Sequence, residues 1–152
     1  MALRRYARLR DWFATTATPR DERPAAVIVI DASVLATALG DDGDDGARAR
    51  ARIRGEDLAA PQIIDLEVVS VWRRTLTNEL RAALALADLD EILLRRAPHQ
   101  PLLARCWELR HNLTPYDASY VALAEALEVQ LVTADKRIAR AAGVRCEIET
   151  LG

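Results

Sequence analysis

Two aspartates follow apolar segments that have the character of buried β-strands. Asp31 comes directly after the β-branched run "VIVI" at residues 27–30, and Asp135 stands two residues beyond "VQLVT" at residues 129–133. The carboxyl ends of neighbouring parallel strands meet at one edge of a sheet, and ligands bind outside that edge. We therefore expect the two carboxylates to lie close together if both strands are parallel and central.

Three further acids lie on segments with helical periodicity. Asp117 is near the start of "TPYDASYVALAEALE" and shares a helix face with the apolar residues at i+3, i+4 and i+7. This places Asp117 at the inward edge of its helix. In "PQIIDLEVVSVWRR", Asp65 and Glu67 both border the buried side of a helix, and periodicity alone does not choose between them.

Each acid taken singly also has a purely structural explanation. Asp31, Asp117 and Asp135 fit helix caps, and Asp65 and Glu67 fit a first helical turn, where the helix dipole favours acids. Three or four carboxylates gathered at one sheet edge, however, repel one another and raise each other's pKa. A divalent cation removes that cost, and oxygen ligands without His or Cys select Mg²⁺ or Mn²⁺. The joint pattern therefore predicts a magnesium or manganese site.

The segments that carry these acids alternate between short apolar strands and helices. Besides the two strands above, "EILLRRAP" and "VRCEIE" indicate short strands, while "DLAAPQII" leads through Pro61 into a helix. Helices are expected over residues 33–39, 47–54, 62–74, 77–91, 99–112, 114–128 and 134–143. This alternation predicts an α/β fold with a central parallel sheet and helices on both faces.

The composition bounds the class of protein. The length of 152 residues suggests one domain, and no apolar run approaches the length of a bilayer span. Cys106 and Cys146 are too few for a disulfide framework, so we expect reduced thiols and a cytosolic protein. The net charge of −2 does not suggest a nucleic-acid binder. Trp72 and Trp107 fall on apolar helix faces and are expected in the core.

The first 26 residues differ in character from the rest of the chain. They combine a short basic amphipathic stretch with "TTATPRDERPAA", which is rich in Thr, Pro and charge. We interpret residues 1–26 as an N-terminal extension or linker of a composition that is commonly disordered, and residues 27–152 as the globular domain.

Four segments, in order along the chain, resemble the successive motifs of the PIN-domain ribonucleases. They are "VIVIDASVL", "PQIIDLEVVSVWRR", "TPYDASYVALAEAL" and "LVTADKRIARAAG". More narrowly, they resemble the VapC toxins of bacterial VapBC toxin–antitoxin systems. The likeness extends from residue 27 to about residue 149, and the N-terminal extension departs from it, since members usually begin just before the first strand.

The resemblance implies a Mg²⁺-dependent endoribonuclease toxin with a PIN-like three-layer sandwich. Its catalytic acids match Asp31, Glu67, Asp117 and Asp135, so the resemblance favours Glu67 over Asp65. Asp31 and Asp117 are then the main Mg²⁺ ligands, with Asp135 and Glu67 completing the site and Mn²⁺ as an alternative ion. The implied chemistry is metal-assisted hydrolysis of an RNA phosphodiester.

Other residues are expected to support this site. Ser33 and Thr133 match polar positions that orient ligands or water. An acidic site repels RNA, so basic groups must flank it. The candidates for that contact are Lys136 and Arg137 beside Asp135, and Arg73 and Arg74 beyond Glu67.

The resemblance also implies partners. VapC toxins form homodimers and are blocked by a VapB antitoxin that inserts a segment into the acidic groove, and the complex binds operator DNA through the antitoxin. The sequence leaves open which RNA is cleaved and whether one or two metal ions take part.

Three other functions fit part of the pattern. A receiver-type signalling domain expects an acidic pair after the first strand, where Asp31 stands alone. A non-catalytic PIN domain that binds RNA or a partner usually lacks one of the four acids. A metal-dependent phosphatase needs "D-x-D" on its nucleophile strand, where Ser33 takes the second position.

Overall fold

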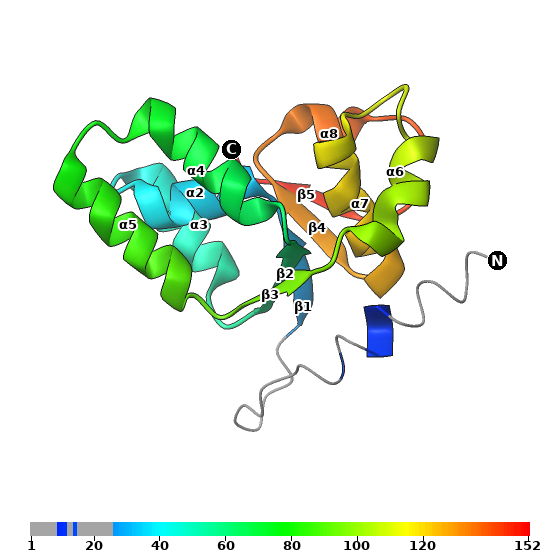
Figure 1. Cartoon of the computed structure of the whole chain (residues 1–152), viewed down its shortest axis with the longest axis horizontal. Helices are drawn as coiled ribbons and strands as arrows, with labels where there is room; N and C mark the ends of the chain where they lie inside the picture. The colour runs from blue at the N-terminus through cyan, green and yellow to red at the C-terminus, as the bar shows by residue number, and fades with distance from the viewer. Residues whose placement is uncertain (1–8, 12–13, 15–25) are drawn as a thin grey trace.

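The computed structural model describes residues 9–11, 14 and 26–152, and its centre is a parallel five-stranded sheet (Figure 1). The strands are β1 (Val27–Ile30), β2 (Asp57–Pro61), β3 (Leu94–Ala97), β4 (Gln130–Thr133) and β5 (Ile148–Thr150). Their order in the sheet is β3-β2-β1-β4-β5, and every neighbouring pair is parallel. β1 is therefore central, and β4 lies beside it.

Helices cover both faces of this sheet. They are α2 (Ala32–Gly40), α3 (Asp44–Ile53), α4 (Ile64–Thr75), α5 (Glu79–Glu91), the 3₁₀ turn η1 (Gln100–Leu102), α6 (Leu103–Glu108), α7 (Pro115–Leu127) and α8 (Lys136–Arg140). Helices α2 to α5 gather on one side and α6 and α7 on the other (Figure 1). The predicted α/β fold with a three-layer arrangement is confirmed. None of the helices in the described part of the chain combines the length and apolar character needed to cross a bilayer.

The central strands are held by burial on both faces. Val29, Ile30, Leu131 and Val132 have no accessible surface. Burying an aliphatic side chain of this size contributes about 1.5–3 kcal/mol to folding. On the other side, α7 is buried around most of its circumference and contacts β1, β2 and β4. The carboxyl ends of β1 and β4 are thus fixed relative to the start of α7.

Two segments differ from the sequence-based expectation. Residues 57–61, expected to lead into a helix, form strand β2, in which Ala59 and Ala60 are fully buried. The segment lacks β-branched residues and ends on a proline, so its composition does not predict a strand. It is a strand because of its packing against neighbouring strands. The helix expected over 99–112 is instead a 3₁₀ turn followed by the six-residue α6.

The two tryptophans assigned to the core have different environments. Trp72 on α4 is 5% exposed, and its Nε1 donates a hydrogen bond to the carbonyl of Ala36 at 3.0 Å. Trp107 on α6 is 69% exposed, so the prediction that it belongs to the core is wrong. The buried residues of this short helix are Arg105 and Cys106, which leaves the indole on the surface.

The predicted extension over residues 1–26 falls outside the described residues except at 9–11, 14 and 26. Where it is described, Leu9 is 1% exposed and belongs to the hydrophobic core. Arg10 donates from Nε to the carbonyl of Ala126 at 2.9 Å and pairs with Glu128. This part of the extension therefore contacts the carboxyl end of α7.

The contrast between the tryptophans predicts unequal effects of the same substitution. Trp72→Phe removes the bond that ties α4 to α2 and leaves the Ala36 carbonyl without that donor, so the free energy of unfolding should fall by about 1–2 kcal/mol. Trp107→Phe, on the surface, should change it by less than ~0.5 kcal/mol. Urea unfolding measures both, and equal losses would contradict this assignment.

Candidate active site

A pocket of about 210 Å³ opens beyond the carboxyl end of β1. Asp31, Glu67, Asp117 and Asp135, the four acids expected to form the site, all line it. They come from the ends of β1 and β4 and from the first turns of α4 and α7. The fold therefore brings together four carboxylates that are widely separated in the sequence.

Asp31 is the most buried of these acids, with 5% of its surface exposed. Its Oδ1 accepts hydrogen bonds from Ser33 Oγ at 2.5 Å and from the Val34 amide at 3.2 Å, and its Oδ2 accepts one from Thr133 Oγ1. The bond from Val34 caps α2, so the capping role and the pocket-lining role belong to the same residue. Burial raises the pKa of Asp31, and the bonds from Ser33 and Thr133 oppose that rise.

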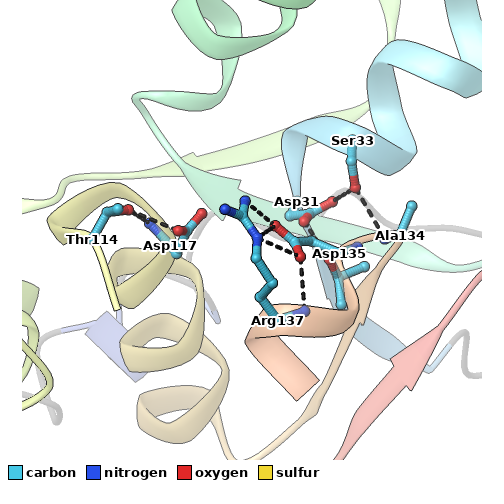
Figure 2. A network of polar contacts seen from close by, with 8 residues as sticks. Asp31, Ser33, Thr114, Asp117, Ala134, Asp135 and Arg137 are labelled. Atoms are coloured by element: carbon cyan, nitrogen blue, oxygen red, sulfur yellow. Dashed lines mark hydrogen bonds and ion pairs between the residues drawn. The ribbon is translucent and has the colours of Figure 1, made fainter. Parts of the chain in front are cut away.

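The two hydroxyls that hold Asp31 also fix the loop after β4. The Ala134 amide donates to Ser33 Oγ at 3.0 Å, and the Asp135 amide donates to Thr133 Oγ1 at 2.9 Å (Figure 2). Ser33 and Thr133 therefore stand where the sequence expected supporting groups. Through them, the position of Asp31 is tied to the backbone that carries Asp135.

Glu67 and Asp65 have different surroundings, although periodicity did not separate them. Asp65 pairs with Arg96 at 2.8 Å and does not line the pocket, whereas Glu67 does. Glu67 Oε2 accepts a hydrogen bond from the Tyr120 hydroxyl, which reaches across from α7. Burial raises the pKa of Glu67, the bond from Tyr120 opposes that rise, and the charges of Asp117 and Asp31 add to it.

Asp117 is not the cap of its helix, contrary to one reading of its position. The cap of α7 is Thr114, whose Oγ1 accepts from the Asp117 amide at 3.1 Å and donates to Asp117 Oδ2 at 2.8 Å (Figure 2). Pro115 occupies the first turn, where its missing N–H costs nothing. The carboxylate is thus oriented by the cap and lines the pocket instead of capping the helix.

Asp135 caps α8 and is paired with Arg137. Its Oδ1 accepts from the Arg137 amide at 2.8 Å, and Arg137 Nη2 lies 2.6 Å from Oδ2. This arginine lowers the pKa of Asp135, and the guanidinium lies between Asp135 and Asp117 in the view of Figure 2. Arg137 is therefore next to the acids, as expected of an RNA contact, but its charge is engaged by one of them. Lys136 is exposed and does not line the pocket.

Besides the four acids and Ser33, the residues that line this pocket are Ala32, Ser70, Val71, Arg74 and Tyr120. Of the two α4 arginines expected to contact RNA, Arg74 therefore lines the pocket and Arg73 does not. Tyr120 was placed only on the apolar side of its helix, yet its hydroxyl holds Glu67. Its spacing of three residues from Asp117 is the signal that relates it to the site. Ser70 and Arg74 line the pocket from α4, one and two turns beyond Glu67.

The donor chemistry of the pocket suits a hard cation, since every candidate ligand is a carboxylate oxygen. The repulsion expected among these acids is present, because the charges of Asp31 and Asp117 both raise the pKa of Glu67. Among the described residues, no three Asp, Glu, His or Cys side chains are arranged to hold an ion as they stand. The metal therefore stays a prediction.

The chain was compared with families and proteins that are already known. The model of the PIN domain matches residues 28–144. Ribonuclease VapC1 of Mycobacterium tuberculosis is 40% identical over 126 residues, which cover 80% of this chain and 95% of VapC1. Ribonuclease VapC9 of the same organism is 41% identical, covering 80% of this chain and 96% of VapC9. The crystal structure of VapBC2 from Rickettsia felis, bound to a promoter DNA fragment, aligns with a TM-score of 0.59 at 14% identity, covering 83% of this chain and 99% of that one.

The burial of Asp31 predicts that its charge opposes folding when no cation is present. Its folded pKa lies above the unfolded value, so the free energy of unfolding falls as pH rises through the folded pKa. In EDTA at neutral pH, Asp31→Asn should therefore raise the free energy of unfolding, on the order of 1 kcal/mol. The gain should vanish in acid, where Asp31 is protonated.

Urea unfolding across a pH series measures this gain. Asp65→Asn is the matched control, and it should not stabilise the protein, because that substitution breaks the pair with Arg96. A loss of stability in Asp31→Asn at neutral pH would contradict the electrostatic assignment.

Proposed function

The chain belongs to the PIN-domain family and, within it, to the VapC proteins, and from this premise we propose that it is a metal-dependent endoribonuclease that acts as the toxin of a VapBC system. One observation carries the proposal: four acids from four separate segments line a single pocket at the carboxyl edge of a parallel sheet. Membership of this family also removes the receiver-type and phosphatase alternatives. A PIN domain that binds RNA without cleaving it remains the competing function.

Asp31, Glu67, Asp117 and Asp135 are the residues that would hold Mg²⁺ or Mn²⁺. When bound, such an ion makes water a stronger acid and offsets the negative charge of a phosphate group. Asp135 is paired with Arg137. If Asp135 joined the other acids around an ion, the Arg137 guanidinium would become available to a phosphate group.

The remaining residues position these acids. Ser33 and Thr133 keep both oxygens of Asp31 oriented, and Thr114 does the same for Asp117. Supporting hydrogen bonds of this kind fix the ligand geometry and exclude alternative rotamers. Arg74, exposed on the last turn of α4, lines the pocket, and this supports a role for it in contacting a phosphate. These side chains would therefore orient the acids and the substrate.

The activity is tested with one variant inside the pocket and one outside it. Purified protein is incubated with total cellular RNA in Mg²⁺ or Mn²⁺, and new RNA ends are mapped. Asp117→Asn should reduce cleavage by at least ~100-fold, because residues that only orient metal ligands are already worth about 10- to 100-fold. Asp65→Asn should cleave at the wild-type rate, and EDTA should stop cleavage.

Metal binding is measured separately, by the paramagnetic resonance signal of free Mn²⁺. The wild-type protein should deplete this signal, whereas Asp117→Asn should deplete it much less. RNA ends that are unchanged in all samples, with Mn²⁺ bound normally, would favour the non-catalytic alternative. Equal cleavage by the wild type and Asp117→Asn would rule out the proposed active site.

We further propose that the protein works with a VapB-like antitoxin and is a homodimer that contacts DNA only through that antitoxin. The VapBC2 structure supports the partner class, because it contains toxin and antitoxin on promoter DNA. The candidate antitoxin is to be sought in a short open reading frame upstream of this gene. Co-expression should yield a stable complex that is inactive on RNA and shifts a fragment of its own promoter.

Light scattering and gel shifts test this assignment with the toxin alone as the control. The toxin alone should have the mass of a dimer and should not shift the promoter fragment. A promoter shift by the toxin alone, or full ribonuclease activity in the complex, would contradict the assignment.

A further inference from the structure

A second cavity lies beside the acidic pocket and shares Asp117 with it. It measures about 370 Å³, and its lining includes Arg110, His111, Asn112 and Arg137. Arg137 also pairs with Asp135, which lines the acidic pocket, so one arginine stands between the two cavities. We call this second cavity the side cleft.

Arg110, which lines the side cleft, lies over the ring of Trp107. The guanidinium carbon of Arg110 is 4.6 Å from the centroid of that ring, and Arg110 Nη1 donates to the Trp107 carbonyl at 2.8 Å. These two contacts restrict the rotamers of Arg110. An arginine restrained in this way loses less side-chain entropy when it binds a partner.

Trp107 is not part of the hydrophobic core formed by the described residues. It is 69% exposed, whereas Trp72 is buried and hydrogen-bonded. Tyr116, at the start of α7, is also 57% exposed. Exposed tryptophan and tyrosine beside cationic groups are the usual components of surfaces that bind unpaired nucleotides.

We propose that the side cleft binds a single-stranded segment of the RNA next to the phosphate that is cleaved. A base stacks on the Arg110–Trp107 pair, and Arg110 and Arg137 contact the phosphates on either side. The strand must be unpaired, since the faces of bases inside a duplex are covered by their neighbours. This inference rests on the proposed function, because it assigns part of the substrate of the same site.

The experiment measures RNA binding without cleavage. Fluorescence anisotropy of a labelled oligouridine is followed in EDTA over a series of salt concentrations. Trp107→Leu should weaken binding by about tenfold, the loss of one stacked base, and should leave the salt dependence unchanged. Arg110→Gln should weaken binding and also lower the slope of log affinity against log salt by ~0.7, the value of one phosphate contact.

Arg54→Gln is the matched control for charge. Arg54 is exposed just before β2, at the opposite edge of the sheet, and its removal should leave the affinity within about twofold of wild type. Urea unfolding checks that each variant is folded. Duplex RNA of the same length should bind more weakly than oligouridine to the wild type, and Trp107→Leu should not weaken it further.

The outcomes separate this inference from the proposed function. Wild-type affinity in both Trp107→Leu and Arg110→Gln would overturn it, even if the protein cleaves RNA, and would assign the side cleft to another partner. Weakened binding in both variants, together with a wild type that never cleaves, would support the side cleft and reject the nuclease. Loss of binding in Arg54→Gln equal to that in Arg110→Gln would also overturn it, because the attraction would then be a matter of overall charge.

Discussion

The constraint on which the site depends is the burial of one carboxylate. Asp31 stands at the end of the central strand with 5% of its surface exposed, and burial raises its pKa. Charge in such a place is costly unless it is hydrogen-bonded or paired. The chain supplies hydrogen bonds from Ser33, Val34 and Thr133, and none of these three partners is cationic. A cation bound beside Asp31 would offset this cost, and the stability of the fold would then depend on whether the site is occupied.

The other three acids are held near Asp31 by strands and helices whose positions are fixed by strand pairing and by core packing. The parallel pairing of β1 with β4 places Thr133 beside Asp31, and the bonds between them follow from strand register. Helix α7 packs against three strands, so its start, with Thr114 and Asp117, has a fixed position relative to the sheet. Tyr120 extends this rigidity to α4 by holding Glu67. The pocket is therefore assembled from core packing and a few hydrogen bonds, not from a flexible loop.

The sequence predicted this site better than it predicted some of the scaffold, and the physical reasons differ. The β-branched run before Asp31 and the periodicity around Asp117 are local signals, and both elements were found. Strand β2 was missed because "DLAAP" has no local strand preference and is a strand only through its neighbours. Asp65 and Glu67 stood equal on periodicity, and they differ only in long-range partners, Arg96 for one and Tyr120 for the other. Trp107 was misassigned because helix α6 ends too early to bury a full apolar face.

The net charge of the whole chain says little about what it binds, whereas the local distribution of charged side chains says more. A net charge of −2 argues against binding a polyanion when it is spread evenly. Here the charges are sorted, with acids lining one cavity and Arg110 and Arg137 lining the next, and Asp117 common to both. Coulomb interactions between exposed charges decay within about 10 Å at ordinary salt, so a bound strand responds to the few residues that it touches and not to the sum. An acidic cavity and a cavity with two arginines thus lie side by side in a protein that is slightly acidic overall. This adjacency, and not either cavity alone, is what supports the proposal of a phosphodiester substrate.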